Sequence, residues 1–420
     1  MKIILSAYAC EPGKGSEPGV GWKWACGLAG RVELTILTRS NNRAAIEAVV
    51  LALSANHPLR QVRFLYHDSD PTWRLLKRFR LLPTLLYYFI WQWTAARQFR
   101  NEADAADIVH HLTFCTALCP GFWNRTKAAR VIGPVAAPLV PEPYLALFGI
   151  RRLSQALRNC LIRNFLKLPW LKKSFIGAAN VAPANSDMKD LLESMGVLCG
   201  EVMLDTGAPT DCPAITRTHK PFGQCNFIYA GVLERRKGLE LALRAFAKFI
   251  QDSELKIQND SSPTFTLLGK GPDRERLQTL AHTLGISEHV HFPGSVPQSE
   301  VARHFAEADV FVFTSVRDAS GGVNLEAMSS GLPIICIAHQ GVGDITDDTC
   351  AIRIAPGTIG ETIEALAMGM QRMTNNPDLR KELGENARRR AMEKFSWDEK
   401  FDRMTKIYES VAPRDANFHF

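Results

Sequence analysis

The segment from Val310 to Ile335 has the sequence VFVFTSVRDASGGVNLEAMSSGLPII, and its pattern decides the fold class of this 420-residue chain. It predicts a buried strand up to Thr314, a turn that bears Asp318, a helix that contains Glu326, and then a second strand. Seven residues separate the two acids across the junction between strand and helix. Both carboxylates can therefore face one crevice at the carboxyl end of a parallel sheet, where open α/β sheets bind ligands.

The turn before the predicted helix contains Gly321 and Gly322. Neither residue has a Cβ atom, so a ligand can approach the backbone closely. The N–H groups from Ser320 to Val323, at the start of the helix, favour an anionic ligand. A phosphate-binding turn flanked by two acids predicts a nucleotide-sugar site.

The rest of the chain alternates short apolar strands with segments long enough for helices, which is the pattern of a parallel α/β sheet. We expect one doubly wound domain over 1–207 and a second over 208–397, with a C-terminal helix, 398–412, that packs back on the first. The stretch from Asp205 to Gly223 carries three prolines and is the expected linker. The expected strands are KIILSAYA, VELTILTR, VRFLYH, DIVHHL and AARVIGPV in the first domain, and FIYAGVL, FTLLGKG, VHFPGSV, VFVFTS and LPIICIA in the second.

The segment from Val310 to Ile335 resembles the donor-binding signature of retaining glycosyltransferases of family 4, in which two glutamates seven residues apart precede a Gly-Leu-Pro turn. Asp318 occupies the first glutamate position and Glu326 the second. The resemblance implies a GT-B fold, in which two Rossmann-like doubly wound domains face each other across a cleft. The N-terminal domain would lie on the acceptor side, and the C-terminal domain would bind the nucleotide sugar. Other segments occur in the family's order: YAGVLERRKGLELALRAF, FTLLGKGPDRERL, VHFPGSVPQSEVARHFAEADVFV and FSWDEKFDRMTKIYE.

The resemblance also implies roles for single residues. Glu326 would accept hydrogen bonds from the ribose hydroxyls, although an acid in a first turn also complements the helix dipole. Asp318 would contact the donor sugar, and the backbone from Ser320 to Val323 would hold the diphosphate or the sugar hydroxyls. Main-chain groups near Val296, in HFPGSV, would meet the nucleobase.

The segment GVLERRKG supplies the expected phosphate-binding cation. Lys237 directly precedes a predicted helix and can place its ammonium on a phosphate, whereas the structural alternative is a solvated surface lysine. The family usually carries arginine at the position of Val232, so we expect Arg235 or Arg236 to supply that second cation.

The first domain contributes a glycine-rich loop with Gly13, Gly15 and Gly19 after the first strand. In the family such a loop closes over the donor, which makes Gly15 a donor-binding candidate. A dinucleotide fingerprint is the alternative, but the glycine spacing is one residue off, and the second strand ends at Arg39 instead of an acid. An NADP-dependent oxidoreductase, with Arg39 on the extra phosphate, is therefore the second functional hypothesis.

A histidine near the donor sugar is common in the family, yet the expected loop, VIGPVAAP from Val131, contains none. His110 and His111 end the preceding predicted strand, and we name His111 as the catalytic candidate. A packed histidine is the structural alternative. The missing loop histidine also leaves open a catalytically inactive GT-B scaffold protein.

Charge is concentrated in one part of the chain. Between Arg60 and Asn180 there are 18 Lys and Arg against 6 Asp and Glu, a net charge of +12, whereas the whole chain carries +7. Two segments, 71–100 and 149–177, combine these cations with bulky apolar residues at helical spacing. Such helices can bind an anionic membrane surface, or they can pack their apolar faces on the sheet. No nucleic-acid-binding module is recognisable, so we expect no nucleic-acid partner.

Composition and motifs narrow the remaining possibilities. The short apolar run at the N-terminus predicts a first strand and not a signal peptide, and ten cysteines without a Cys-x-x-Cys pair are typical of a reducing cytoplasm. The inner membrane face is the candidate site of peripheral attachment. No cluster with metal-ligand spacing occurs, so we expect neither metal nor cofactor beyond the nucleoside-diphosphate sugar donor. The predicted activity is retaining hexose transfer to a glycan or lipid-linked acceptor.

Overall fold

The computed structural model describes residues 1–73, 84–112, 114–209, 223–252 and 262–413. Chain contacts divide it into two compact units. Most of the predicted linker, 210–222, lies outside the described residues. Unit 1 comprises Met1–Ala137, Ile162–Thr206 and Asp398–Phe420, and unit 2 comprises Pro138–Leu161 and Gly207–Trp397.

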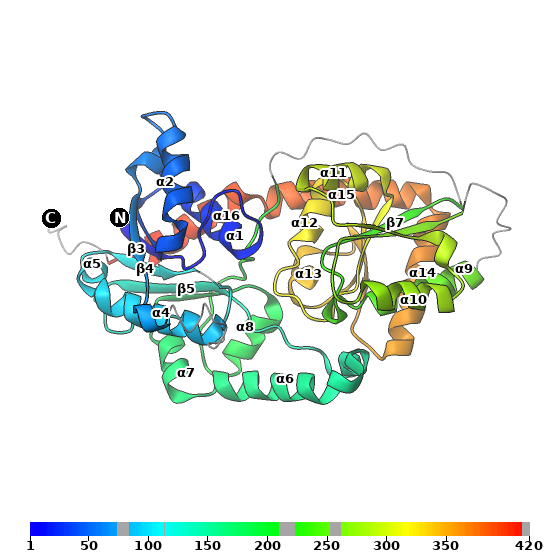
Figure 1. Ribbon diagram of the computed structural model, residues 1–420, viewed down its shortest axis with the longest axis horizontal. Coiled ribbons are helices and arrows are strands. Elements are labelled where there is room, and N and C mark those ends of the chain that lie inside the picture. The colour runs from blue at the N-terminus through cyan, green and yellow to red at the C-terminus, as the bar shows by residue number, and fades with distance from the viewer. Residues whose placement is uncertain (74–83, 113, 210–222, 253–261, 414–420) are drawn as a thin grey trace. The chain divides into compact units, whose positions relative to one another are not determined.

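The described part of unit 1 contains a six-stranded parallel sheet with strand order β3-β2-β1-β4-β5-β6 (Figure 1). In its centre, Leu5 lies opposite Ile36 on one side and His110 on the other. The chain winds outward from β1 to β3 and then crosses to β4, so the strand order reverses between β1 and β4. The strands are β1 (Lys2–Ser6), β2 (Glu33–Arg39), β3 (Arg63–His67), β4 (Ile108–His111), β5 (Ala129–Val135) and β6 (Asn180–Pro183).

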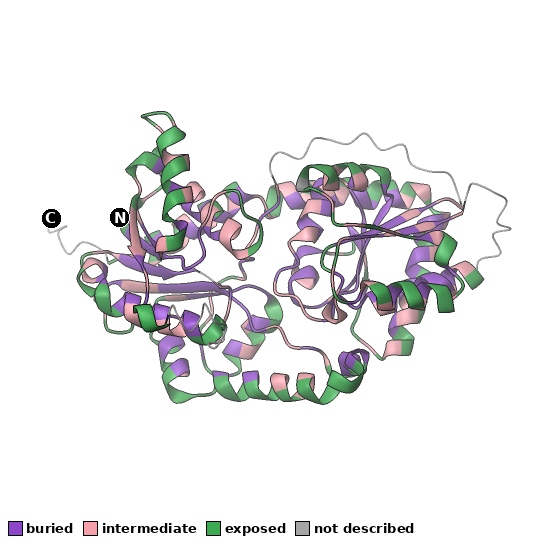
Figure 2. Cartoon of the chain, viewed as in Figure 1, coloured by how far each residue is buried: buried purple, intermediate pink, exposed green. Residues whose placement is uncertain are grey.

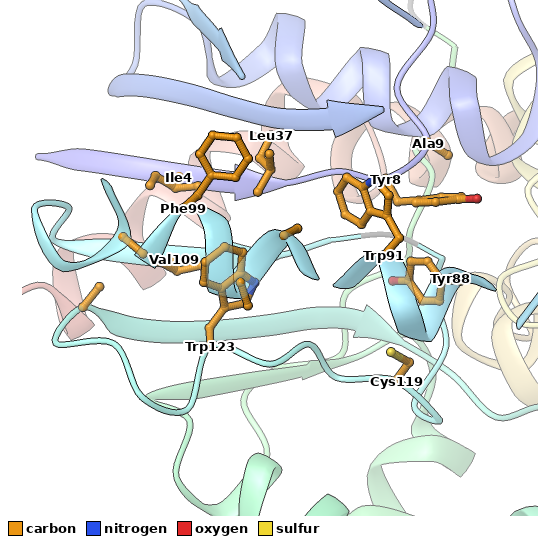
Figure 3. Packing of buried hydrophobic residues seen from close by; sticks show 14 of the residues in the cluster. Ile4, Tyr8, Ala9, Leu37, Tyr88, Trp91, Phe99, Val109, Cys119 and Trp123 are labelled. Atoms are coloured by element: carbon orange, nitrogen blue, oxygen red, sulfur yellow. The ribbon is translucent and has the colours of Figure 1, made fainter. Parts of the chain in front are cut away.

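Aromatic side chains fill the core of unit 1 on one side of this sheet. The ring of Tyr8, just after β1, packs edge-on against Tyr88 and Trp91 at centroid distances of 5.0 and 5.1 Å (Figure 3). Aromatic edge-to-face packing of this kind stabilises a core beyond the area it buries. The helices assigned to unit 1 are α1 (Ser16–Leu28), α2 (Arg43–Ala52), α4 (Thr84–Gln98), α5 (Arg100–Asp104), α7 (Pro169–Ile176), α8 (Ser186–Glu193) and α16 (Trp397–Val411), with 3-10 turns η1 (Ser40–Asn42) and η2 (Pro58–Gln61).

The C-terminal helix α16 packs on unit 1. The Tyr408 hydroxyl lies 2.5 Å from His110 Nδ1, and the rings of Phe401 and Trp24 meet at 5.6 Å. At the surface, Arg31 pairs with Asp398 at 3.3 Å. Residues nearly 300 positions apart therefore hold one unit together.

Unit 2 contains a second six-stranded parallel sheet within its described residues, with strand order β12-β11-β10-β7-β8-β9. Val310 of β10 lies opposite Phe227 of β7, and the strand order reverses between these two strands. The strands are β7 (Asn226–Ala230), β8 (Thr264–Leu268), β9 (Val290–Gly294), β10 (Val310–Phe313), β11 (Ile334–Ile337) and β12 (Ala351–Ile354). The helices are η3 (Glu142–Arg151), η4 (Arg235–Lys237), α9 (Leu239–Asp252), α10 (Arg274–Thr283), η5 (Ser287–His289), α11 (Gln298–Glu307), α12 (Val323–Ser329), α13 (Gln340–Ile345), α14 (Ile359–Asn375) and α15 (Pro377–Lys394).

The prediction of an α/β fold with two doubly wound parallel sheets is confirmed. Every residue of β10 and β11 is buried, and Figure 2 shows buried strands within mostly exposed helices. Strands covered on both faces are continuous apolar runs, because neither face meets water. This is why VFVF and IICI were recognisable as strands in the sequence.

One segment belongs to a different unit from the domain to which the sequence assigned it. The stretch 138–161 was placed in the first domain, but its contacts lie in unit 2. Gln340 Nε2 donates to Leu139 O at 2.6 Å, and a guanidinium nitrogen of Arg235 donates to Leu147 O at 2.9 Å. The helix α6 (Arg152–Leu166) begins in unit 2, and its residues from Ile162 onward belong to unit 1.

Candidate functional site

The predicted site lies at the carboxyl ends of β7 and β10, the two central strands of the unit 2 sheet. The chain leaves β7 toward one edge of the sheet and leaves β10 toward the other. Ligands of open α/β sheets bind outside the carboxyl ends of the strands at such a switch point. The loop after β7, 231–238, and the loop after β10, 314–322, both emerge there.

Hydrogen bonds fasten these two loops together. The Thr314 hydroxyl donates to the carbonyls of Lys237 and Gly238, each at 3.1 Å, and Val316 N donates to Arg236 O at 2.8 Å. Gly238 has a φ of +63°, and a Cβ there would lie 2.1 Å from Thr314 O. Only glycine fits this position, because the close approach and the left-handed backbone both exclude a side chain.

The loop contact brings Lys237 and Asp318 together as an ion pair between Nζ and Oδ2. Lys237 is only 9% exposed, and its ammonium lies 5.5 Å from the centre of the Phe313 ring. Burial lowers the pKa of Lys237, and the Asp318 carboxylate acts in the opposite direction. A cation held in so little water interacts strongly with an anion, because screening is weak there.

Arg236, and not Arg235, is the arginine beside this pair. A guanidinium nitrogen of Arg236 lies 3.7 Å from Asp318 Oδ2, and its Nε pairs with Glu234 at 2.6 Å. Arg235 instead pairs with Asp273 at 3.3 Å. The alternative that the sequence left open is thus resolved in favour of Arg236 as the neighbour of Asp318.

The loop that bears Asp318 is supported by α13. Asp318 N donates to Gln340 Oε1 at 2.6 Å. A Cβ on Gly341 would lie 2.4 Å from the Cα of Ser320, so helix and loop backbones are in direct contact. The position of the carboxylate is therefore fixed by packing, and not by Lys237 alone.

The glycine turn and the start of α12 directly follow Asp318 and its loop in the chain. Gly321 has a φ of +62°, and its carbonyl accepts from Asn324 N at 2.9 Å and from Asn324 Nδ2 at 2.8 Å. Glu326 N donates to Gly322 O at 3.3 Å, which places half-buried Glu326 on the first turn of α12. The roles predicted for Glu326 and for the backbone from Ser320 to Val323 stay predictions.

The predicted nucleobase loop leaves the same edge of the sheet. Half-buried Val296 follows β9, and the neighbouring Gly294 accepts from Gly269 N at 2.8 Å. A Cβ on Gly269 would lie 1.9 Å from Gly231 O, so the loops after β7, β8 and β9 are closely packed. Unit 2 thus positions Val296, Lys237 and the Asp318 loop after β9, β7 and β10, at the same edge of the sheet.

Two predicted site residues lie in unit 1. Gly15 is the N-cap of α1, and a Cβ there would meet nothing within 4 Å. The His111 ring is buried, and its Nε2 lies 2.9 Å from Cys119 O. A carbonyl can only accept, so His111 Nε2 carries the proton. Burial lowers the pKa of His111 to about 4. The ring is therefore neutral near pH 7, and its catalytic role stays a prediction.

Sequence reasoning missed several polar residues around this loop. Gln340, Gln155, Arg158 and Arg317 all contact or neighbour it. No local pattern could identify Gln155 and Arg158, because they belong to a segment that the sequence assigned to the other domain. Among the residues that the structure describes, no group of three potential metal ligands lies together.

Comparison with known sequences places the C-terminal half of the chain. Residues 217–390 match the family described as Glycosyl transferases group 1. A D-inositol 3-phosphate glycosyltransferase of Corynebacterium jeikeium is 27% identical over 265 residues, 58% of this chain and 60% of the relative. An MMP alpha-(1->4)-mannosyltransferase of Mycolicibacterium hassiacum is 28% identical over 182 residues, 43% of this chain and 41% of that relative. The chain thus aligns with between 41% and 60% of the lengths of these curated relatives.

Solved structures extend the likeness over the whole chain. Sucrose-phosphate synthase of Thermosynechococcus elongatus matches with a TM-score of 0.61 at 17% identity, over 98% of both chains. Anabaena HepE, in complex with UDP, matches with a TM-score of 0.59 at 13% identity, over 98% of this chain and 100% of that chain. Likeness at this level of identity concerns the fold, and it confirms the predicted GT-B class.

Proposed function

Because residues 217–390 belong to the group 1 glycosyl transferases, we propose that the chain transfers a hexose from a nucleoside-diphosphate sugar to an acceptor hydroxyl. The observation that carries this proposal is the Lys237–Asp318 pair at the switch point of the unit 2 sheet. In this pair, the desolvated ammonium of Lys237 would bind the diphosphate, and the carboxylate of Asp318 would accept hydrogen bonds from the sugar hydroxyls. Arg236 adds a second cation 3.7 Å from the same carboxylate.

The chemical task of such a site is to stabilise the departing diphosphate. Negative charge grows on the leaving oxygen as the bond to the sugar breaks, and preorganised donors lower the barrier most where charge develops. Lys237 and Arg236 would supply this stabilisation, with the N–H groups of the glycine turn. Asp318 would hold the sugar, and Glu326 would accept from the ribose hydroxyls.

The stereochemical course and the proton route are further parts of the proposal. With retention, the acceptor hydroxyl attacks on the face from which the diphosphate leaves. Its proton then passes to the leaving oxygen, so no separate base is needed. We propose that this reaction proceeds without a metal ion, because the cations of unit 2 can carry the charge of the diphosphate. Activity in the presence of excess EDTA would support this part, and loss of activity would contradict it.

The UDP complex of HepE suggests UDP as the first nucleoside diphosphate to test. Binding of a ligand to the folded state raises stability by about 2.7 kcal/mol at 100 times its dissociation constant. Thermal unfolding with UDP, GDP and ADP, each compared with its monophosphate, would therefore identify the base. Protection by one diphosphate, weaker with the monophosphate, supports the proposed site; no protection by any of them contradicts it.

The two other functional hypotheses make different predictions. An NADP-dependent oxidoreductase needs a free Arg39 beside the first loop, but Arg39 Nε donates to Tyr8 O at 3.1 Å and its guanidinium lies 4.3 Å from the centre of the Tyr8 ring. Protection by NADP would nevertheless favour that enzyme. A scaffold protein would bind no donor productively, so measurable transfer or hydrolysis of a nucleotide sugar excludes it.

A lipid-linked acceptor at the inner membrane face is the finer part of the partner proposal. In the segment 149–177, Leu153, Leu157 and Leu161 recur every four residues on one face of α6, and they are 80%, 58% and 59% exposed. Exposed Arg151 and Arg152 adjoin this stripe. Apolar residues flanked by cations on one exposed helix suit the headgroup layer of an anionic bilayer.

The other basic segment behaves differently in the structure. Residues 74–83 of the segment 71–100 lie outside the described residues, and its described helix α4 buries Tyr87, Tyr88 and Trp91 in unit 1. Packing therefore accounts for much of the apolar face of α4, and α6 is the proposed membrane element. Among the described helices, none is long and apolar enough to cross a membrane.

Vesicle flotation tests the α6 proposal. The chain should float with vesicles that contain anionic phosphatidylglycerol, and replacing Leu153, Leu157 and Leu161 together by serine should abolish this. Equal flotation of the triple variant would contradict the proposed surface. The exposed leucines make the variant's folding easy to preserve, and unchanged thermal unfolding would verify it.

A further inference from the structure

Arg317, directly before Asp318, is held by the segment that joins unit 2 from the N-terminal half. One of its guanidinium nitrogens donates to Gln155 Oε1 at 2.7 Å, and its backbone carbonyl accepts from Arg236 at 3.2 Å. The side chain is half-buried. Its position beside the proposed sugar contact is therefore fixed from two elements.

A second arginine comes from the same helix as Gln155. Arg158 follows Gln155 by three residues, so both side chains lie on one face of α6. Arg158 is also half-buried, and it donates to Pro138 O at 3.1 Å. Burial lowers the pKa of Arg158.

Arg317 bonds to Gln155, and Arg158 lies on the same face of α6 one turn later, so α6 places the two arginines next to one another. Burial lowers the pKa of Arg317 to about 10, and the charges of Arg158 and Arg236 contribute further, whereas Glu234 and Asp318 oppose the change. Glu234 and Asp318 pair with Arg236. Within the described residues, no carboxylate lies within ion-pair distance of Arg158 or Arg317.

Two neighbouring, half-buried cations without a carboxylate at ion-pair distance repel each other. Burial of a charge is tolerated where a counter-ion compensates it. Glu234 and Asp318 act on Arg317 from a distance and pair with Arg236, so an anionic ligand would supply the direct counter-ion. Guanidinium groups bind planar carboxylates in a bidentate manner, which makes arginine suitable for this recognition.

We propose that Arg158 and Arg317 form a second anion site, which binds a carboxylate on the donor sugar, so that the donor is a nucleoside-diphosphate uronic acid. The proposal rests on the proposed glycosyltransferase function and deepens it. We place this site at the sugar and not at the diphosphate, because Arg317 adjoins Asp318, the proposed sugar contact. Lys237 and Arg236 would bind the diphosphate.

The experiment compares donors that differ only in the carboxylate. Once the base is known, calorimetric titration compares UDP-glucuronate with UDP-glucose, or GDP-mannuronate with GDP-mannose. The wild-type chain should bind the uronate about tenfold more tightly, a difference of about 1.4 kcal/mol. Arg317→Gln and Arg158→Gln should each abolish the preference, whereas Arg158→Lys should retain part of it, and Arg163→Gln, at an exposed position of α6, should retain all of it.

The free nucleoside diphosphate separates this inference from the function on which it rests. Its affinity should be unchanged in Arg317→Gln and Arg158→Gln, which also verifies that both variants fold. Equal loss for the diphosphate alone would overturn the inference, because the arginines would then belong to the diphosphate site. Equal wild-type affinity for uronate and hexose donors would also overturn it. Absence of any diphosphate binding would instead overturn the proposed function.

Discussion

Replacing Lys237 by alanine tests the diphosphate contact most simply. Lys237 is 9% exposed, and within the described part of the chain its ammonium pairs with the Asp318 carboxylate. A hydrogen bond to a charged group contributes about 1.5–3 kcal/mol, so the affinity for the nucleoside diphosphate should fall by about 10- to 150-fold. The lower part of this range is expected, because Arg236 remains 3.7 Å from Asp318 and can turn toward the ligand.

The fold should tolerate this replacement. Asp318 keeps Arg236 nearby and is 21% exposed in its side chain, so its carboxylate is not left buried without a partner. Titration calorimetry with the diphosphate gives the affinity, and thermal unfolding gives the stability. Lys248→Ala is the matched control, since Lys248 lies on α9 of the same unit and pairs with Asp252 at 3.0 Å. Unchanged affinity in a folded Lys237→Ala chain would refute the phosphate role.

Three further predictions concern other residues. Glu326→Gln should weaken nucleoside-diphosphate binding while thermal unfolding stays nearly the same; equal affinity in calorimetry would count against the ribose contact. Burial lowers the pKa of both His110 and His111 from 6.5 to about 4, so the unfolded chain takes up protons first as the pH falls. The free energy of unfolding, measured by urea titration at each pH, should therefore decrease from pH 6.5 toward pH 4. This decrease should be smaller for His111→Gln than for the wild-type chain; an identical pH dependence would contradict the assignment. Gly238→Ala should destabilise unit 2 by about 1–4 kcal/mol, because the new Cβ would meet Thr314 O; a wild-type midpoint in denaturant would disprove this.

The strands and the core of the site were accessible from the sequence for physical reasons. Buried parallel strands are continuous apolar runs, so the segments VFVF and IICI can be recognised as strands from the sequence. Lys237 and Asp318 each lie in the loop that follows a central strand, and the topology of a doubly wound sheet brings such loops together.

The choice between neighbours and the assignment of distant segments needed coordinates. Arg235 and Arg236 are adjacent and chemically identical, and only the backbone turn decides that Arg236 lies beside Asp318. The segment 138–161 contains an ordinary helical pattern, which carries no information about the unit on which it packs. Its attachment depends on single contacts such as Gln340 with Leu139, more than 200 residues apart.

A crystal structure of the chain with its nucleoside diphosphate tests the central claim most directly. The account predicts diphosphate oxygens within about 2.7–3.2 Å of Lys237 Nζ, with the ribose near Glu326 at the start of α12. A nucleotide bound instead in unit 1, on the glycine loop at Gly15 and beside Arg39, would contradict the claim and would favour a dinucleotide-binding enzyme.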